Sequence, residues 1–481
     1  MTSLADLIKA YDVRGVTPEP FSPEVARAIG AAFAEVVGGP RVVIGRDMRP
    51  SGPELVAAFA EGVTRRGIDV VRIGLCSTDG LYHASGALGV PGAMFTASHN
   101  PAAYNGIKMC HAGARPVGQD TGLTEIRRLA ETYLDEGLPA AAATPGTVRD
   151  HEMLADYAAF LRGLVDLSGI RPLKVVVDAG NGMAGLTAPA VLGTEAGLPA
   201  LPLDVVPLYF ELDGSFPNHE ANPLEPANLR DLQAAVVEHG ADIGLAFDGD
   251  ADRCFVIDER GEPVSPSAIT ALVGLREVAR ERAEGRTPTV IRNLITSAAV
   301  PDLLEAAGAT VVRTRVGHSF IKAQMAEHDA VFGGEHSAHY YFRDFFFADT
   351  GMLAAMHVLA ALGQARRADG SGAALSELAE AYEPYVASGE INSRVADVPA
   401  ARQRVVDVYV TREEAGPVVV DELDGLTVSH WDGHPRWWFN LRASNTEPLL
   451  RLNVEAADED VMEKVRDDVL ALVRQGGEEQ A

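Results

Sequence analysis

The chain has 481 residues, of which 47% are apolar and 23% charged, proportions that are ordinary for a globular protein. Its 41 lysines and arginines are outnumbered by 68 aspartates and glutamates, and the net charge of −27 argues against non-specific binding to nucleic acid or to an anionic membrane. The length predicts about three to four domains. Cys76, Cys110 and Cys254 are odd in number and far apart, which indicates a reduced setting without disulfides.

The N-terminus has no basic region followed by an apolar run, and no stretch approaches the length of uninterrupted apolar sequence that a membrane helix needs. We therefore expect neither a signal peptide nor a membrane span, and we expect a cytoplasmic protein.

The first part of the chain alternates predicted helices and strands. One helix begins at Ser22, a good N-cap that is followed by proline, and another covers about 53–66. Buried strands are predicted at 41–45 and 70–74, and further strands at 174–178 and 241–247 continue the alternation. This rhythm is typical of layered α/β units whose sheets are at least partly parallel.

The first polar segment is Thr-Ala-Ser-His-Asn-Pro at 96–101, directly after a short apolar run. A hydroxyl on Ser98 beside the imidazole of His99, in a loop at a strand end, could meet a ligand. An ordinary turn built by serine, asparagine and proline is the alternative for this segment taken alone. A serine-protease arrangement is not indicated, because the chain has no Gly-x-Ser-x-Gly elbow at Ser98.

The second polar segment, Asp-Gly-Asp-Ala-Asp-Arg at 248–253, is the most informative. Asp248, Asp250 and Asp252 alternate with two very small residues, so a short loop can turn all three carboxylates toward one point. Like charges this close repel unless a cation lies between them, and oxygen ligands favour Mg²⁺ before Ca²⁺. A calcium EF-hand loop is disfavoured, because its sixth position needs glycine and Arg253 stands there, between strand-like flanks.

The third part of the chain continues with strands at 289–292 and 309–312. The third polar segment, Gly-Gly-Glu-His-Ser-Ala-His at 333–339, places Glu335, Ser337 and His339 on one side of an extended stretch, which suits sugar hydroxyls. A zinc site lacks the expected HExxH spacing and a nearby thiolate. A structural turn with a buried histidine remains the alternative.

The chain changes character after about residue 385. Apolar, strand-like runs at 405–410, 436–441 and 449–454 precede a helix with Val461, Val465, Val469 and Leu472 on one face. This order predicts a separate α+β domain with strands first and a helix last.

The fourth polar segment, Arg-Ala-Ser-Asn-Thr-Glu-Pro at 442–448 with Arg451 beyond it, lies in that domain. Hydroxyls, an amide and guanidinium groups around a tight turn can hold a phosphate. It is not a P-loop, because no GxxxxGK[ST] motif occurs, and an ordinary polar hairpin loop is the alternative.

Together, the four segments resemble those of the α-D-phosphohexomutase family in order and over nearly the whole chain. Members carry a Thr-x-Ser-His-Asn-Pro phosphoserine loop, an Asp-Gly-Asp-x-Asp-Arg magnesium loop, a Gly-Glu-x-Ser-x-His sugar loop and an Arg-x-Ser-Asn-Thr-x-Pro phosphate loop. The segments at 11–15 and 213–219 match two further family elements.

The resemblance implies three layered α/β domains with mixed sheets and a C-terminal α+β domain around a central cleft. We expect a phosphoserine-loop domain at 1–145, a magnesium-loop domain at 146–261, a sugar-loop domain at 262–375 and a phosphate-loop domain at 376–481.

The resemblance also implies a mutase that interconverts hexose 1-phosphate and hexose 6-phosphate through a phosphoserine and a 1,6-bisphosphate. One Mg²⁺ per chain would bind Ser98 and the three aspartates of the loop at 248–252. The expected catalytic side chains, besides Ser98, are Lys108, His339 and Arg14. The side chains expected to support the phosphoserine are His99, Asn100 and Arg253. The side chains expected to contact the sugar are Glu335, Ser337, His318 and Lys322. The side chains expected to hold the distal phosphate are Arg442, Ser444, Asn445, Thr446 and Arg451.

The sugar loop resembles the phosphomannomutase/phosphoglucomutase branch, so the expected substrate is a mannose or glucose phosphate, with glucose or mannose 1,6-bisphosphate as activator and intermediate. Phosphoglucosamine mutases usually carry glutamine where this chain has His336. That activity and a metal-dependent sugar phosphatase are the alternatives. The expected partner is a small sugar phosphate, with no nucleic acid or membrane, and the oligomeric state is left open.

Overall fold

The computed structural model describes residues 2–9, 11–410, 418–443 and 449–475, which form four sheets with helices packed on them. The first sheet is mixed, in the order β1-β5-β4-β2-β3-β7, with β6 paired to β5. Its strands are β1 (Val13–Val16), β2 (Arg41–Arg46), β3 (Asp69–Leu75), β4 (Gly92–Phe95), β5 (Tyr104–His111), β6 (Arg115–Pro116) and β7 (Val148–Asp150). The helices of this domain are α1 (Pro23–Val37), α2 (Gly52–Arg65), α3 (Thr78–Leu88) and α4 (Leu123–Glu136).

The second and third sheets are also mixed, in the orders β12-β11-β10-β8-β9 and β14-β13-β15-β16-β17. The second domain has β8 (Leu173–Asp178), β9 (Leu203–Leu208), β10 (Ile243–Phe247), β11 (Cys254–Ile257) and β12 (Pro263–Val264), with α5 (Leu154–Leu164), α6 (Ala184–Val191) and α7 (Arg230–His239). The third has β13 (Thr289–Asn293), β14 (Thr310–Thr314), β15 (Phe332–Gly334), β16 (Tyr340–Phe342) and β17 (Ala348–Asp349), with α8 (Pro266–Ala283), α9 (Ala299–Ala306), α10 (His318–His328), α11 (Gly351–Gln364) and α12 (Leu375–Glu380).

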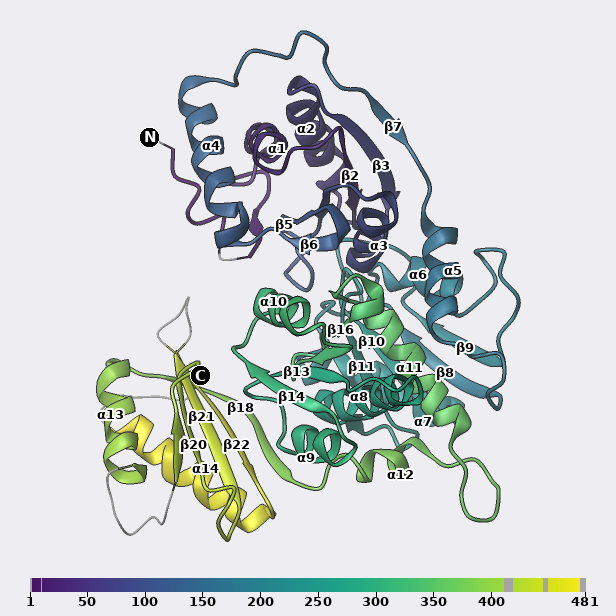
Figure 1. The fold of residues 1–481 in the computed structure, drawn as a ribbon, viewed down its shortest axis with the longest axis vertical. Coiled ribbons are helices and arrows are strands. Elements are labelled where there is room, and N and C mark those ends of the chain that lie inside the picture. The colour runs from purple at the N-terminus through teal and green to yellow at the C-terminus, as the bar shows by residue number, and fades with distance from the viewer. Residues whose placement is uncertain (1, 10, 411–417, 444–448, 476–481) are drawn as a thin grey trace.

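The fourth sheet is antiparallel throughout, in the order β18-β22-β21-β20-β19, and lies to one side of the other three (Figure 1). It contains β18 (Val386–Arg394), β19 (Val419–Asp421), β20 (Leu426–Ser429), β21 (Trp437–Ala443) and β22 (Leu449–Ala456), with α13 (Val398–Tyr409) and α14 (Glu459–Arg474). The predicted fold class, three α/β domains with mixed sheets and a C-terminal α+β domain, is confirmed.

Most predicted elements occur where the sequence placed them. Ser22 caps α1 by accepting a hydrogen bond from the Val25 amide, as its position before proline predicted. The strand expected at 405–410 is wrong, because this run lies in α13. Asp397 caps α13, and Pro399 stands in its first turn. Val405 packs in the core of the domain, so capping and packing outweigh the strand preference of the β-branched residues.

One continuous core joins the second and third domains. Buried side chains from both sheets, such as Val177 and Val290, belong to the same apolar cluster as Leu359 of α11. The first and fourth domains have apolar clusters of their own. The second and third domains therefore form a shared base. We propose that the first domain ends after β7, which pairs with β3 of its sheet.

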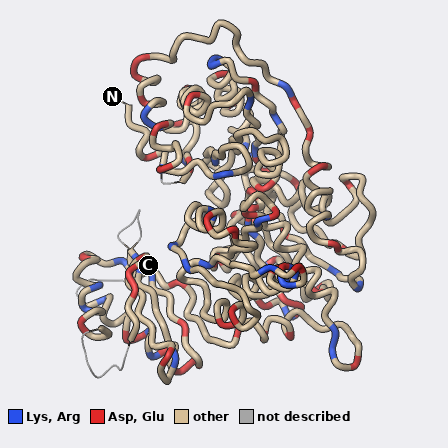
Figure 2. The backbone as a smooth tube through the Cα atoms, in the orientation of Figure 1, with Lys and Arg blue, Asp and Glu red and all other residues tan. Residues whose placement is uncertain are grey.

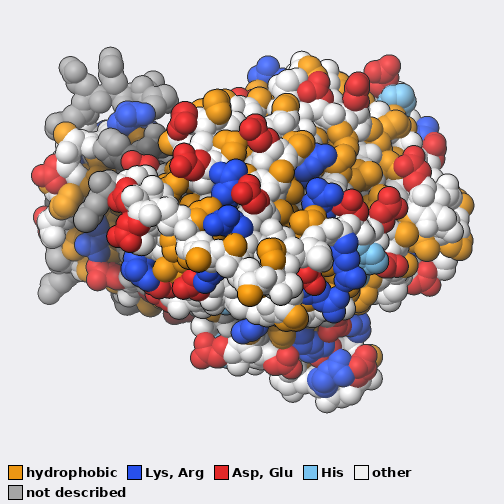
Figure 3. Space-filling model, turned by 90° about the horizontal axis from the view of Figure 1, so that it is seen from above, with side chains coloured by type: hydrophobic (Ala, Val, Ile, Leu, Met, Phe, Trp, Pro, Cys, Tyr) orange, Lys and Arg blue, Asp and Glu red, His pale blue; other side chains and the backbone are white. Residues whose placement is uncertain are grey.

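The face seen in Figure 3 carries acidic and basic side chains interspersed with apolar ones. In the part of the chain that the structure describes, no helix combines the length and apolarity needed to cross a membrane.

Helices α1 and α2 pack closely because a glycine stands at their crossing. A methyl group on Gly62 would fall far inside contact distance of the Arg27 carbonyl oxygen. Gly62→Ala is therefore expected to destabilise the protein by about 1–3 kcal/mol, because the helices must separate. Gly163, exposed in α5 with open space around it, is the matched control, and Gly163→Ala should stabilise by about 0.5–1 kcal/mol. Chemical denaturation measures both, and an equally stable Gly62→Ala variant would contradict this packing.

Candidate functional site

Loops from the first three domains meet at one place. The loop at 96–101 follows β4, the loop at 248–253 joins β10 to β11, and the loop at 335–339 joins β15 to β16. Arg253 and His339 form a backbone bridge between the last two loops. Figure 2 shows acidic and basic residues side by side where the first domain meets the others. The topology thus gathers three of the four polar segments.

Ser98 lies in the left-handed region, with a φ of 49°, and is buried. Its hydroxyl donates to Asp248 Oδ2 over 2.8 Å and lies 3.1 Å from His99 Nδ1. Arg253 Nη2 lies 2.6 Å from the same ring nitrogen. Burial, and then the nearby Arg253, lowers the pKa of His99 to about 2. His99 is therefore a neutral imidazole whose Nδ1 can accept the hydrogen bond from Arg253.

Asp248, Asp250 and Asp252 are fully buried, and one oxygen of each lies within 4.8 Å of the others. Asp250 Oδ1 and Asp252 Oδ1 have no hydrogen-bond partner, although buried polar atoms are normally paired. Burial, strengthened by Asp252 and Asp250 and opposed by Arg253, raises the pKa of Asp248 to about 7. Two unpaired carboxylate oxygens within a buried acidic cluster fit a hard divalent cation.

Lys108 on β5 lies beside this cluster. Its Nζ donates to Asp250 Oδ2 over 2.7 Å and to Asp252 Oδ2 over 2.5 Å. Burial alone would lower the pKa of Lys108, but the two carboxylates raise it well above its ordinary value. Lys108 is therefore protonated and holds two of the three carboxylates.

Arg14 on β1 donates from Nη1 to Asn100 Oδ1 over 2.6 Å and from Nη2 to Asp12 Oδ2 over 2.6 Å. It therefore orients the predicted phosphoserine loop from a neighbouring strand.

The loop at 335–339 approaches the aspartate loop from the third domain. His339 Nε2 lies 3.8 Å from Asp252 Oδ1, and Ser337 Oγ lies 3.2 Å from His339 Nδ1. Glu335 is buried and accepts from Tyr341 over 2.6 Å and from Asn293 over 3.1 Å. These bonds hold the Glu335 carboxylate in one orientation.

Two residues of α10, Lys322 and His318, were expected to contact the sugar. Lys322 is buried, pairs with Asp349 Oδ1 at 2.6 Å and lies 4.1 Å from the centre of the Tyr82 ring. It therefore joins the third domain to the first. His318 begins α10, and its side chain lies outside the described residues.

Arg442 and Arg451 face each other on β21 and β22. Glu390 reaches both, with its Oε1 3.0 Å from Arg451 Nη1 and its Oε2 3.6 Å from Arg442 Nη2. Asp424 Oδ2 lies 3.6 Å from Arg442 Nη1. The arginine pair is thus neutralised by carboxylates. Ser444, Asn445 and Thr446 lie outside the described residues.

Arg49, which sequence reasoning missed, holds the loop of Ser98. Its buried guanidinium donates over 2.7–2.9 Å to four backbone carbonyls. The accepting carbonyls belong to Ser98, Asn100, Pro101 and Tyr104. It also pairs with Asp47 at 3.2 Å. The available signal was a charged pair directly after a buried strand, at the end where α/β sheets place ligand sites.

Known proteins match the chain from end to end. Models described as phosphoglucomutase/phosphomannomutase alpha/beta/alpha domains I, II and III match residues 5–136, 155–261 and 265–385, and the C-terminal domain of that family matches residues 390–472. A phosphomannomutase of Salmonella typhimurium is 40% identical over 480 residues, covering 99% of this chain and 100% of that protein. A protein of Xanthomonas campestris described as phosphohexose mutases is 39% identical over 475 residues, covering 97% and 98%.

Solved structures agree with the sequence matches. A phosphoglucomutase/phosphomannomutase family protein from Burkholderia thailandensis superimposes with a TM-score of 0.84 at 30% identity, covering 99% of both chains. An N-acetylphosphoglucosamine mutase from Aspergillus fumigatus, solved with GlcNAc-6P and magnesium, shares the fold with a TM-score of 0.61 at 14% identity, covering 99% of this chain and 97% of that one.

Arg49→Lys is expected to loosen the loop of Ser98, because lysine cannot replace the four bonds that the guanidinium makes to the backbone. Losing charge-assisted bonds of about 1.5–3 kcal/mol should speed hydrogen exchange of the Asn100 and Tyr104 amides by about 10- to 100-fold. Hydrogen–deuterium exchange measures this. Arg46→Lys is the control, since within the described residues the Arg46 guanidinium donates to a single carbonyl, that of Asp47. Unchanged hydrogen exchange in Arg49→Lys would show that the loop keeps its structure without the hydrogen bonds of Arg49.

Proposed function

The chain belongs to the phosphoglucomutase/phosphomannomutase family and is a hexose phosphate mutase, and we propose that it works through a phosphoserine at Ser98. The proposed reaction interconverts the 1-phosphate and 6-phosphate of mannose, glucose or both. One observation carries the proposal: the Ser98 hydroxyl donates directly to Asp248 at the edge of a buried three-carboxylate cluster. A phosphoryl group on that oxygen would meet the same cluster.

We propose that the aspartate cluster and an oxygen on Ser98 hold one Mg²⁺. The unpaired oxygens of Asp250 and Asp252 support this, and oxygen ligands are those that Mg²⁺ prefers. When bound, the ion would neutralise charge on the transferred phosphoryl group. The Aspergillus fumigatus enzyme of the same fold was solved with magnesium.

The chain's own cations would complete the neutralisation. Arg253 lies between Asp248 and His99, and Arg14 orients Asn100, so both border the space beside the Ser98 hydroxyl. His99 and Asn100 would support the phosphoserine as neutral groups. Phosphoryl transfer depends mainly on such positioning and charge stabilisation.

Proton transfer is proposed for Lys108 and His339. Lys108 is held protonated by two carboxylates and would return a proton to Ser98 Oγ when the phosphoryl group leaves it. His339, between Asp252 and the loop of Ser337, would serve the sugar hydroxyl.

Sugar recognition is proposed for Glu335 and Ser337, with His318 also on the sugar side. The bonds that fix Glu335 favour this role, because a fixed carboxylate can select a hydroxyl position. Lys322 was predicted with them, but its buried ion pair to Asp349 and its contact with the Tyr82 ring of the first domain favour a role in joining domains.

The phosphate that is not reacting would bind Arg442 and Arg451 together with Ser444, Asn445 and Thr446. Glucose or mannose 1,6-bisphosphate would form when Ser98 donates its phosphoryl group, and would then present its other end. The arginines would therefore serve both half-reactions.

A coupled assay tests the proposal. Mannose 1-phosphate and glucose 1-phosphate should each yield the 6-phosphate, with activation by glucose 1,6-bisphosphate. Ser98→Ala should abolish turnover, and intact protein should show a fraction about 80 Da heavier that maps to Ser98. Free phosphate in place of isomer would favour the phosphatase alternative, and exclusive activity on glucosamine phosphate would favour the phosphoglucosamine mutase. Full mutase activity in Ser98→Ala would refute the phosphoserine.

Arg442→Ala should weaken binding of glucose 1-phosphate, mannose 1-phosphate and the bisphosphate alike, by about 1.5–3 kcal/mol, because one charge-assisted phosphate contact is lost. Calorimetric titration measures the three affinities. Arg436→Ala is the control, since Arg436 is an exposed arginine directly before the same strand. If Arg442→Ala changes the preference between the two sugars and leaves overall affinity intact, Arg442 reads the sugar and this assignment is wrong.

A further inference from the structure

The first turn of α3 touches the aspartate loop directly. Thr78 Oγ1 donates to Asp250 Oδ2 over 2.5 Å, and the Thr78 amide donates to the Asp250 carbonyl over 3.0 Å. Both residues are completely buried. One threonine of the first domain therefore holds the backbone and the side chain of a carboxylate in the second.

The next residue ties this turn to the second and third domains. Asp79 Oδ2 accepts from Tyr157 of α5 over 2.7 Å and from Thr350 over 2.6 Å, and Asp79 Oδ1 accepts from Ser77. Thr350 also caps α11, whose first glycine packs on the Arg253 backbone. The position of Thr78 is thus set by contacts from the second and third domains as well as its own.

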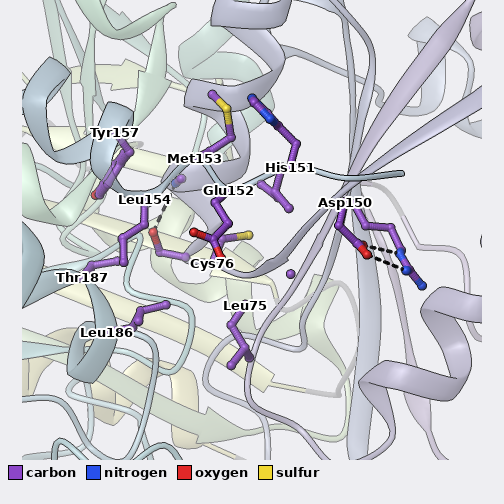
Figure 4. Close-up of a pocket in the computed structure, with 15 residues that line it drawn as sticks. Leu75, Cys76, Asp150, His151, Glu152, Met153, Leu154, Tyr157, Leu186 and Thr187 are labelled. Atoms are coloured by element: carbon purple, nitrogen blue, oxygen red, sulfur yellow. Dashed lines mark hydrogen bonds and ion pairs between the residues drawn. The ribbon is translucent and has the colours of Figure 1, made fainter. Parts of the chain in front are cut away.

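A cavity of about 380 Å³ lies on the other side of the turn. Cys76, Met153, Tyr157 and Leu186 line it, and Figure 4 shows these side chains around the open space. Side chains do not fill the space on that side of the turn, so the hydrogen bonds of Asp79 and Thr78 contribute more to fixing its position.

We propose that Thr78 is a positioning residue that fixes Asp250 for the cation, and this rests on the proposed magnesium site. Asp250 Oδ2 accepts from Thr78 and from Lys108, whereas Asp250 Oδ1 has no partner and is available as a ligand. Lys108 brings a positive charge that opposes a bound cation, and its proposed proton transfer requires it to change partners. Thr78 is neutral and anchored, so it holds the carboxylate throughout the reaction. Outer partners of this kind tune metal affinity.

The test is calorimetric titration of the full chain with magnesium chloride, supported by the magnesium dependence of mutase activity. Thr78→Val and Thr78→Ala should each weaken magnesium binding by about 10-fold, and Thr78→Ser should restore it. Activity at saturating magnesium should largely recover in the variants without the hydroxyl. Thr187→Val is the matched control, because Thr187 lines the same cavity and its hydroxyl donates to the carbonyl of Met183, the N-cap of its own helix. Thermal unfolding verifies that each variant is folded. If Thr78→Val is not folded, Thr78→Ala is the variant that tests the loss of the hydroxyl.

Asp250→Asn separates this inference from the proposed metal site. Weak magnesium binding in Asp250→Asn, with parental binding in both Thr78→Val and Thr78→Ala, overturns the role of Thr78 and leaves the metal site intact. Parental binding in Asp250→Asn overturns the metal site and the inference together. A loss of activity in Thr78→Val that is independent of magnesium concentration also overturns the inference, since it would show a merely structural role.

Discussion

The mutual repulsion of three buried carboxylates is the constraint on which the rest of this site depends. Asp248, Asp250 and Asp252 stand within 4.8 Å of one another in a region that water does not reach. Ionised together, they would cost far more than a fold can offset unless cations and donors surround them. Lys108 of the first domain and Arg253 of the second offset part of this cost by pairing with the carboxylates. The unpaired oxygens of Asp250 and Asp252 show where the compensation is incomplete. Groups from separate domains therefore come together at the carboxylate cluster to satisfy this electrostatic requirement.

The arrangement of the domains follows from the same requirement. The second and third domains share a core and present two loops that bridge at Arg253 and His339. The first domain has its own core, and some of its apolar side chains, such as Tyr82 and Cys110, also pack into the shared core of the base. Polar groups of the first domain, among them Ser98, Lys108, Thr78 and Asp79, reach the same base. Polar and apolar contacts between the first domain and the base allow a site to be assembled from several directions.

The sequence predicted the loops well and their supports poorly, for physical reasons. Spacing alone showed that the aspartates converge, because alternate positions in a short loop share a direction. Arg49 and Thr78 were missed because their partners are backbone carbonyls and a carboxylate more than forty positions away, which no local pattern displays. The run at 405–410 was taken for a strand because valine favours strands, and the cap at Asp397 together with packing of Val405 decided for a helix. The buried ion pair between Lys322 and Asp349 could not be predicted for the same reason, since only the fold brings the two residues together.

The net charge of the whole chain affects how such a site can bind an anionic ligand. Because the chain has a net charge of −27, a bisphosphate, which carries two anionic phosphate groups, is attracted only by local cations. Arg442 and Arg451 are the proposed cations, yet Glu390 already lies beside both and Asp424 lies beside Arg442. In the proposed mechanism a phosphate would have to displace these carboxylates, so part of its binding energy would be offset. That would suit the proposed intermediate, which has to leave the arginine pair and return with its other end, because tighter binding without competing carboxylates would hold the first orientation too long.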